Sequence, residues 1–242
     1  MSKRKDKRQT AALFSTITQR TNRVDGDDDA VAGDTTPGHD QNPLSDAVLA
    51  QSKELAPLIM APDQATRELT KMKKFRFQLL HQWMVTELAP CRMADVGGGK
   101  GLLAYLFQQS GWAATVIDPI QQGLPDKYKD MATAKQMRIP PTARVPRIDR
   151  PFTPSMAADF DILVAMHAHG CNIQMIDAAA HYGRSVILLP CCIIQEPLIP
   201  PPGTHWIQCV VDYALQQALS IRPFRLNFKG QNIGLYLQPK GR

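Results

Sequence analysis

The residues of this chain with the clearest chemical meaning form a glycine-rich stretch, Asp-Val-Gly-Gly-Gly-Lys-Gly, at positions 95–101. An apolar run precedes it, and apolar residues at helical spacing follow from Leu102. Glycines at such a junction let the backbone approach a ligand closely. A second apolar run, 113–117, ends in Asp118, and an acidic residue about twenty positions after the glycines typically accepts hydrogen bonds from ribose hydroxyls. The two features together predict a site for a nucleotide-type cofactor.

The spacing of the glycines narrows the kind of cofactor. A dinucleotide-binding G-x-G-x-x-G loop would place its third glycine where the chain has Leu102. A phosphate-binding P-loop would need Ser or Thr after Lys100, and the chain has Gly101 there. The glycines therefore fit neither of these loops, and a plain tight turn between strand and helix stays open as the alternative.

The acidic residue followed by G-x-G-x-G resembles motif I of the class I S-adenosylmethionine-dependent methyltransferases. The resemblance implies that Asp95 lies near the methionine end of S-adenosylmethionine and that Asp118 holds its ribose. It also implies that the glycine loop and the end of a strand predicted at 159–166 line the cofactor. The residues concerned are Gly97, Gly98, Gly99, Gly101 and Met166. S-adenosylmethionine is therefore the expected cofactor.

The rest of the sequence alternates between strand-like and helix-like segments. Strands are predicted at 92–96, 113–118, about 134–139, 159–166, 184–190, 223–228 and 232–237, and helices at 100–109, about 172–181 and 205–219. Such alternation predicts an α/β fold with a largely parallel sheet. The last two strands, joined by turn-forming residues, predict a β-hairpin. With the resemblance, this implies a Rossmann-like methyltransferase fold, a seven-stranded mixed sheet with a C-terminal β-hairpin.

Three regions are predicted along the 242 residues. Residues 1–45 begin basic, turn acidic and contain few apolar side chains, so we expect a disordered N-terminal arm. Its short apolar patch at 11–17 is a candidate contact for a protein partner. Residues 46–90 are expected to form N-terminal helices because their apolar residues recur at helical spacing, and 91–242 are expected to form the methyltransferase domain.

Histidines and cysteines follow two neighbouring predicted strands. His167 and His169 come after the fourth strand, and Cys191 and Cys192 come after the fifth. Because reactive groups lie beyond the carboxyl ends of the strands in an open α/β sheet, we expect all four near the site. His167 is the first candidate and His169 the second for a base that deprotonates a hydroxyl or amine acceptor; a structural role in ordering the loop is the alternative. The cysteines are expected to line the substrate or cofactor pocket, with a thiolate nucleophile for carbon-5 methylation of a pyrimidine as the other interpretation.

The loops that carry these residues narrow the resemblance. Met-His-Ala-His-Gly at 166–170, followed by Pro-Cys-Cys at 190–192, is similar to a subgroup that includes the methyltransferase-like 25 proteins and the 2′-O-methyltransferase of the tRNA acceptor stem. The subgroup has a cysteine where this chain has His169. The similarity covers about residues 68–240 and implies methylation of RNA, either tRNA or rRNA.

The distribution of charge also favours RNA as a partner. The formal net charge is +6, and basic residues gather at the N-terminus, at 67–76, at 127–150 and from Arg222 to the C-terminus. Basic surface supplies affinity for the phosphates of a nucleic acid. The expected function is an S-adenosylmethionine-dependent RNA methyltransferase. The alternatives are a catalytically silent protein of this fold that binds RNA or a ribonucleoprotein partner, and a methyltransferase for a small molecule or a protein.

Composition bears on compartment, membrane and metal. The five cysteines are an odd number and give no disulfide framework, so an intracellular, reducing compartment is expected, with cytoplasm, nucleus and mitochondria all open. The chain has no run of apolar residues long enough for a membrane span, so no membrane partner is expected. No group of His and Cys has the spacing of a zinc motif, and the sequence therefore predicts no metal.

Overall fold

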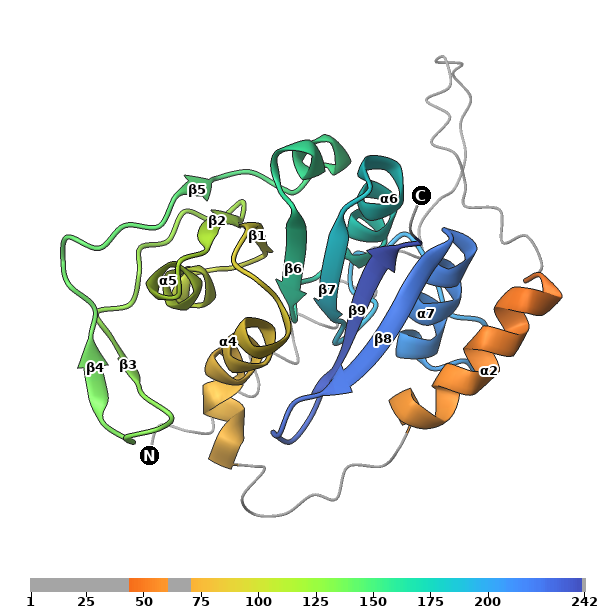
Figure 1. Cartoon of the computed structure of the whole chain (residues 1–242), viewed down its shortest axis with the longest axis horizontal. Helices are drawn as coiled ribbons and strands as arrows, with labels where there is room; N and C mark the ends of the chain where they lie inside the picture. The colour runs from red at the N-terminus through yellow and green to blue at the C-terminus, as the bar shows by residue number, and fades with distance from the viewer. Residues whose placement is uncertain (1–43, 61–70, 241–242) are drawn as a thin grey trace, which may run out of the picture. The chain divides into compact units, whose positions relative to one another are not determined.

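The computed structural model describes residues 44–60 and 71–240. The arm predicted at 1–45 lies, except for its last two residues, outside the described residues. The described part contains a seven-stranded sheet with helices on both of its faces (Figure 1). Within it, no helix is long and apolar enough to cross a membrane.

The elements have the following bounds. The main sheet consists of β1 (Arg92–Val96), β2 (Ala113–Ile117), β5 (Arg147–Ile148), β6 (Ile162–Met166), β7 (Ser185–Leu189), β8 (Leu219–Arg225) and β9 (Ile233–Pro239). A separate hairpin consists of β3 (Lys127–Lys129) and β4 (Gln136–Arg138). The helices are α2 (Asp46–Met60), α4 (Arg76–Glu87), α5 (Leu102–Gln109), α6 (Asn172–Tyr182) and α7 (Trp206–Gln216), with 3-10 turns η1 (Lys73–Phe75) and η2 (Pro154–Asp159).

The strands of the main sheet have the order β5-β2-β1-β6-β7-β9-β8. The first five run parallel, whereas β9 is antiparallel to both β7 and β8. The direction in which strands are added reverses between β1 and β6, and open α/β sheets typically bind a ligand at the carboxyl ends of the strands at such a point. The seven-stranded mixed sheet with its closing hairpin confirms the predicted Rossmann-like fold class.

Both faces of the central strands β6 and β7 are buried, as their nearly continuous apolar sequences require. In β6, Leu163 and Ala165 pack into the core beneath α2, α6 and α7, whereas Val164 and Met166 pack into the core beneath α4 and α5. The same alternation in β1 places Asp95 on the α4–α5 face. Its side chain is only 2% exposed, so an acidic group lies inside the protein at the end of a central strand.

The structure corrects part of the predicted strand pattern. The strand predicted near 134–139 is not in the main sheet, because its residues form β4 of the separate hairpin. The place at the sheet edge is taken by β5, whose two residues are too few to give a periodic signal. The strand predicted at 159–166 begins later because η2 precedes it. The predicted last turn of α7 is absent because Ala218, at φ +57°, ends the helical path before β8.

The N-terminal helices pack onto this core. On one face α2 lies against α7, where Gln208 Nε2 donates to Ser52 Oγ and Ser52 Oγ donates to Asp212 Oδ1, each over 2.6 Å. On the other face α4 packs against α5 (Figure 1). The region predicted at 46–90 does form helices within its described part, namely α2 and α4, and η1 directly precedes α4.

Candidate functional site

The glycine loop between β1 and α5 follows a path that favours glycine. Three of its residues have positive φ: Gly97 at +68°, Gly99 at +53° and Gly101 at +77°. A Cβ on Gly97 would lie 2.6 Å from the Cβ of Ala168, and one on Gly98 would run into the carboxylate of Asp95. The loop therefore lies directly against the β6 loop on one side and against a buried acid on the other.

Two side chains from neighbouring strands hold this loop. Asp118, directly after β2, accepts the N–H of Gly99 on Oδ2 and the N–H of Ile120 on Oδ1, both over 2.8 Å. Arg147 in β5 donates to the carbonyl of Gly99 over 2.8 Å and to that of Ile120 over 3.1 Å, and it pairs with Asp149 over 3.1 Å. The N–H and the carbonyl of Gly99 are thus both held from the side of β2 and β5. The ribose contact of Asp118 stays a prediction.

A cavity of about 610 Å³ opens at the carboxyl ends of β1 and β6, within the size range of small-molecule sites. The predicted cofactor residues that line it are Asp95, Gly97, Gly98, Gly99 and Met166. Gly101 instead caps α5, with its Cα turned toward Val116. His167 completes the lining from β6. The structure therefore brings most of the predicted cofactor residues to one cavity.

Further walls of this cavity come from η1, from α4 and from the β3–β4 hairpin. They include Lys74, Arg76, Phe77, Gln78, Lys127, Tyr128 and Lys129. Gln78 joins the two walls, since its Nε2 donates to the Lys129 carbonyl over 2.8 Å and its Oε1 accepts the Met131 N–H over 2.7 Å. A wall rich in basic side chains therefore faces the glycine loop.

Two polar atoms of the lining are buried without a hydrogen-bond partner among the described residues, Asp95 Oδ2 and Arg76 Nε. Burial raises the pKa of Asp95 to about 7; the Ala104 N–H and Arg147 oppose this rise and Asp118 adds to it. A carboxylate oxygen and a guanidinium N–H, both unpaired, complement a ligand that carries both an ammonium and a carboxylate.

His167 follows β6 with φ +57°, an uncommon conformation for a residue with a side chain. Its Nε2 lies 2.7 Å from the carbonyl of Gln231 in the β8–β9 loop. Because a carbonyl oxygen only accepts, Nε2 carries the proton and Nδ1 keeps its lone pair. Burial lowers the pKa of His167; the Gln231 contact opposes this shift, and Arg76 and Lys73 add to it. The ring is therefore neutral near pH 7 with one basic nitrogen, the form that a general base needs.

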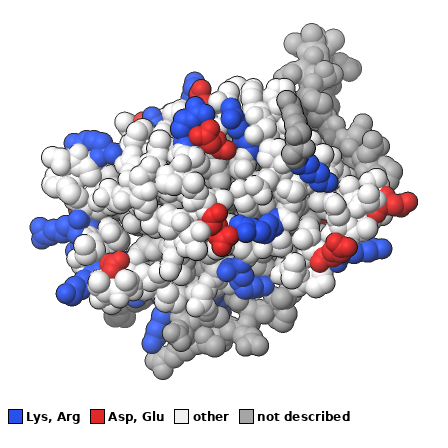
Figure 2. All heavy atoms as spheres, in the orientation of Figure 1, with Lys and Arg blue, Asp and Glu red and all other residues white. Residues whose placement is uncertain are grey.

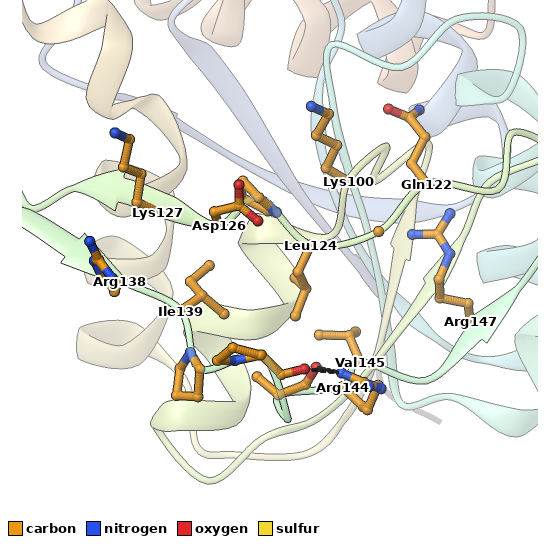
Figure 3. Close-up of a pocket in the computed structure, with 15 residues that line it drawn as sticks. Lys100, Gln122, Leu124, Asp126, Lys127, Arg138, Ile139, Arg144, Val145 and Arg147 are labelled. Carbon is orange, nitrogen blue, oxygen red and sulfur yellow. Dashed lines mark hydrogen bonds between the residues drawn. The ribbon is translucent and has the colours of Figure 1, made fainter.

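A second cavity of about 900 Å³ adjoins the first, and Lys100, Pro125 and Lys127 line both. The charged residues of its lining are Lys100, Lys127, Arg138, Arg144, Arg147 and Asp126. Figure 3 shows Lys127 and Arg138 of the hairpin on one side, with Lys100 and Arg147 on the other. Basic side chains also predominate at the edge of the face in Figure 2 where Figure 1 places β3 and β4. We call this second cavity the basic cleft.

The other predicted residues, His169, Cys191 and Cys192, lie together but line neither cavity. The two thiols are 3.6 Å apart. Burial raises the pKa of Cys191 to about 11, with the neighbouring Cys192 as the next cause, so its thiol is protonated at neutral pH. A thiol in that state does not favour the thiolate chemistry of carbon-5 methylation. The place of these cysteines in a substrate pocket stays a prediction.

Arg76 and Arg147 are candidate site residues that the sequence reasoning missed. Both belong to stretches noted only for their positive charge. Arg76 begins α4 at the cavity wall, and Arg147 reaches Gly99 because β5 pairs with β2. No local pattern marks either residue, since only the strand order and helix packing bring them to the loop.

The sequence matches no known family model and no curated protein. Among solved structures it is similar to the ribosomal protein L11 methylase of Lactobacillus delbrueckii subsp. bulgaricus, with 18% identity, 69% of this chain and 78% of that chain covered, and a TM-score of 0.40. It is similar to magnesium protoporphyrin IX methyltransferase of Synechocystis with bound SAM, with 13% identity, 82% and 100% covered, and a TM-score of 0.44. A third is the 1,6-didemethyltoxoflavin-N1-methyltransferase of Burkholderia thailandensis, with 14% identity, 80% and 88% covered, and a TM-score of 0.39.

Proposed function

We propose that the protein is an S-adenosylmethionine-dependent methyltransferase that acts on RNA. The observation that carries the proposal is the pair of opposite polar atoms, Asp95 Oδ2 and Arg76 Nε, in the lining of one cavity beside the glycine loop. Buried polar atoms without a partner are costly, so the pair indicates a ligand that bonds to both. The methionine part of S-adenosylmethionine has an ammonium for the first and a carboxylate for the second.

The glycine loop fits the same ligand. Gly97 and Gly98 leave no room for side chains, whereas nothing lies within 4 Å of a Cβ built on Gly99, so the backbone itself is the surface that a ligand meets. We assign the ribose to Asp118, whose oxygens already accept one N–H each and retain further lone pairs. When bound, the cofactor supplies a methyl group on a sulfonium, and its transfer to a nucleophile depends chiefly on alignment.

We assign the general base to His167. Its Nε2 is bonded to the Gln231 carbonyl, so Nδ1 is the nitrogen that accepts a proton from the acceptor group. The Gln231 contact holds the ring at the mouth of the cavity that Asp95 and Gly97 also line. His169, the second candidate, lies with the cysteines outside this cavity.

RNA, either tRNA or rRNA, is the proposed methyl acceptor because the cofactor cavity adjoins the basic cleft. Lys127 lines both cavities, and Lys100 stands at the junction between them. Neither residue forms an ion pair within the described part of the chain. Unpaired basic side chains around a cleft attract the phosphates of a nucleic acid and bring its bases or riboses to the adjoining cavity.

A catalytically silent protein that binds RNA is the second candidate function. The hydrogen bond from His167 to Gln231 favours it, because the same contact would also serve merely to fasten the β8–β9 loop to β6. In that case the cofactor cavity would retain its shape while His167 had no proton to accept. The two functions differ in turnover and not in RNA affinity.

Transfer of a radioactive methyl group from S-adenosylmethionine to cellular RNA tests the proposal. We expect the wild-type protein to transfer label to RNA, and ribonuclease should remove that label. The His167→Ala variant should still bind the cofactor but should not label RNA. His181→Ala, at an exposed position in α6, is the matched control and should label as the wild type does. Cofactor binding and RNA binding without any transfer would support the silent protein instead. Absence of cofactor binding would overturn both the assignment of the cavity to S-adenosylmethionine and the proposal that the protein is a methyltransferase.

A further inference from the structure

Three side chains able to bind a metal meet where the loops after β6 and β7 lie side by side. His169 comes from the first loop, and Cys191 and Cys192 come from the second. One ligand atom from each residue lies within 4.8 Å of the other two. The two cysteines are half-buried and His169 is exposed, so the group is open to solvent on one side.

The two loops are fastened to each other, which keeps these ligands together. The His167 N–H donates to the Leu189 carbonyl over 3.2 Å. Glu196, at the end of the cysteine loop, accepts the N–H groups of Asn172 (3.1 Å) and Ile173 (3.2 Å) at the start of α6. A metal site whose ligands are positioned in advance needs less ordering when the ion binds.

Gly170 strengthens the same junction. A Cβ at this position would lie 2.9 Å from the Cβ of Gln195, in the cysteine loop. The close approach therefore depends on glycine directly after His169. Backbone packing, together with the Glu196 contacts, sets the separation between the histidine and the thiols.

We propose that His169, Cys191 and Cys192 bind one Zn²⁺ ion. Two thiolates and one imidazole form a donor set that suits zinc. In a tetrahedral site with Zn–S bonds of about 2.3 Å, two sulfurs lie about 3.8 Å apart, and the two thiols here are 3.6 Å apart. The exposed ring of His169, with a nitrogen within 4.8 Å of both sulfurs, provides the third corner.

Binding is accompanied by loss of protons and leaves one position open. Each thiol gives its proton to the buffer as its sulfur forms a bond to the metal, so affinity falls at low pH. Three protein ligands leave the fourth corner of a tetrahedron for water or another small donor, as in catalytic rather than structural zinc sites.

The site is missed by spacing rules because its ligands are unusual in sequence. Two adjacent cysteines and a histidine from a different loop match no zinc motif. It uses none of the residues that line the cofactor cavity. Metal binding by these three residues is therefore independent of the proposed methyl transfer, and it can be measured without S-adenosylmethionine.

Titration of the full, reduced chain with Co²⁺, a spectroscopic substitute for Zn²⁺, tests this site. We expect one equivalent to bind with the near-ultraviolet charge-transfer absorption of thiolate–cobalt bonds and with the visible bands of tetrahedral Co²⁺, and Zn²⁺ to displace it. Cys191→Ser should remove most of the charge-transfer absorption and weaken binding at least about 10-fold, and His169→Ala should weaken it by a similar factor.

Matched controls are available for both changes. Cys91 is also half-buried, and burial raises the pKa of its thiol to about 11, as in Cys191; Cys91→Ser should leave the Co²⁺ spectrum unchanged. His181→Ala is the control for His169→Ala and should also leave the Co²⁺ spectrum unchanged. Circular dichroism checks the fold of every variant. A wild-type spectrum without charge-transfer absorption, or equal Co²⁺ affinity in Cys191→Ser, would overturn the zinc site.

Discussion

The carboxyl end of β1 and the carboxyl ends of β6 and β7 are built in opposite ways. After β1, the backbone forms the ligand-facing surface, and Asp118 and Arg147 hold both peptide groups of Gly99 from behind. After β6 and β7, the proposed chemistry belongs to side chains, and the backbone positions them. There His167 adopts a left-handed conformation and bonds to a loop carbonyl, and Cys191 has Cys192 as its neighbour.

We expect the two ends to control different properties, ligand affinity at the first and turnover at the second. A backbone surface fixed by charge-assisted hydrogen bonds determines affinity for a ligand, since a small shift of the loop changes every contact at once. Side chains on separately fastened loops determine what is done to that ligand. Substitutions at the first end should therefore alter binding, and substitutions at the second should alter turnover while binding persists.

The largest effect is expected at the second end, from His167→Ala. Loss of the proposed general base should lower kcat by about 10²–10⁴-fold while the Kd for S-adenosylmethionine stays nearly unchanged. Because the pKa of His167 is lowered by burial, wild-type activity should fall only when the pH drops below the ordinary range of histidine. Steady-state rates across pH, with His181→Ala as control, measure both effects. A tenfold or greater rise in Kd would show that the ring belongs to the binding surface instead.

Asp95→Asn should sharpen the contrast by separating stability from binding. The raised pKa means that the contribution of Asp95 to stability is fully present below the ordinary pKa of 3.8 and is lost as the pH rises through about 7. Without ligand, the free energy of unfolding of the variant should exceed that of the wild type by up to about 4 kcal/mol above pH 7. The excess should shrink as the pH falls toward 4, whereas cofactor binding should be weaker at every pH.

Urea unfolding at several pH values, paired with calorimetry, checks this behaviour. A difference that does not depend on pH would mean that burial does not raise the pKa of Asp95. A variant that is less stable at all pH values would contradict the missing hydrogen-bond partner of Oδ2.

Arg147→Lys should have a smaller effect at the first end. Lysine keeps the charge but loses the planar fork that reaches the carbonyls of Gly99 and Ile120 together, so the Kd for S-adenosylmethionine should rise about 10-fold with kcat little changed. Arg144→Lys is the matched control, because Arg144 also donates to two carbonyls, but in its own loop. Equal affinities of the two variants for S-adenosylmethionine would show that the Arg147 contacts do not support cofactor binding.

The smallest effect is expected in the basic cleft. Changing Lys127 and Arg138 together to Glu should weaken RNA binding several-fold and reduce the dependence of log K on log salt by about 1–2. Lys53→Glu on the exposed side of α2 provides the control. Filter binding at several salt concentrations measures the slope of log K against log salt. An unchanged slope would show that RNA binds to another surface of the protein.

The sequence predicts the first end better than the second. The loop at 95–101 and Asp118 are readable because glycine has one clear use at a strand–helix junction, and the structure does bring Asp118 to Gly99. Arg147 is not predictable in this role, because Gly99 lies 48 positions away in the chain and the contact depends on β5 pairing with β2. Topology, not local pattern, completes the loop.

At the second end, residue types were readable and their arrangement was not. His167, His169 and the cysteines were expected together because adjacent parallel strands end at one edge. His167, in a left-handed conformation, lines the cavity, whereas His169 and the cysteines lie outside it, where Gly170 packs on Gln195. Neither of these features leaves a signal in the sequence apart from the glycine itself.

Calorimetric titration of S-adenosylmethionine into the wild-type protein, Gly97→Ala and Gly183→Ala shows whether the glycine loop after β1 binds this cofactor. Gly97 and Gly183 have nearly equal φ values, +68° and +64°, but only Gly97 would place a Cβ against a neighbour. We predict binding of one equivalent to the wild type and to Gly183→Ala, and at least about 100-fold weaker binding to Gly97→Ala. No heat with the wild type, or equal affinity in Gly97→Ala, would contradict the assignment of this loop to the cofactor.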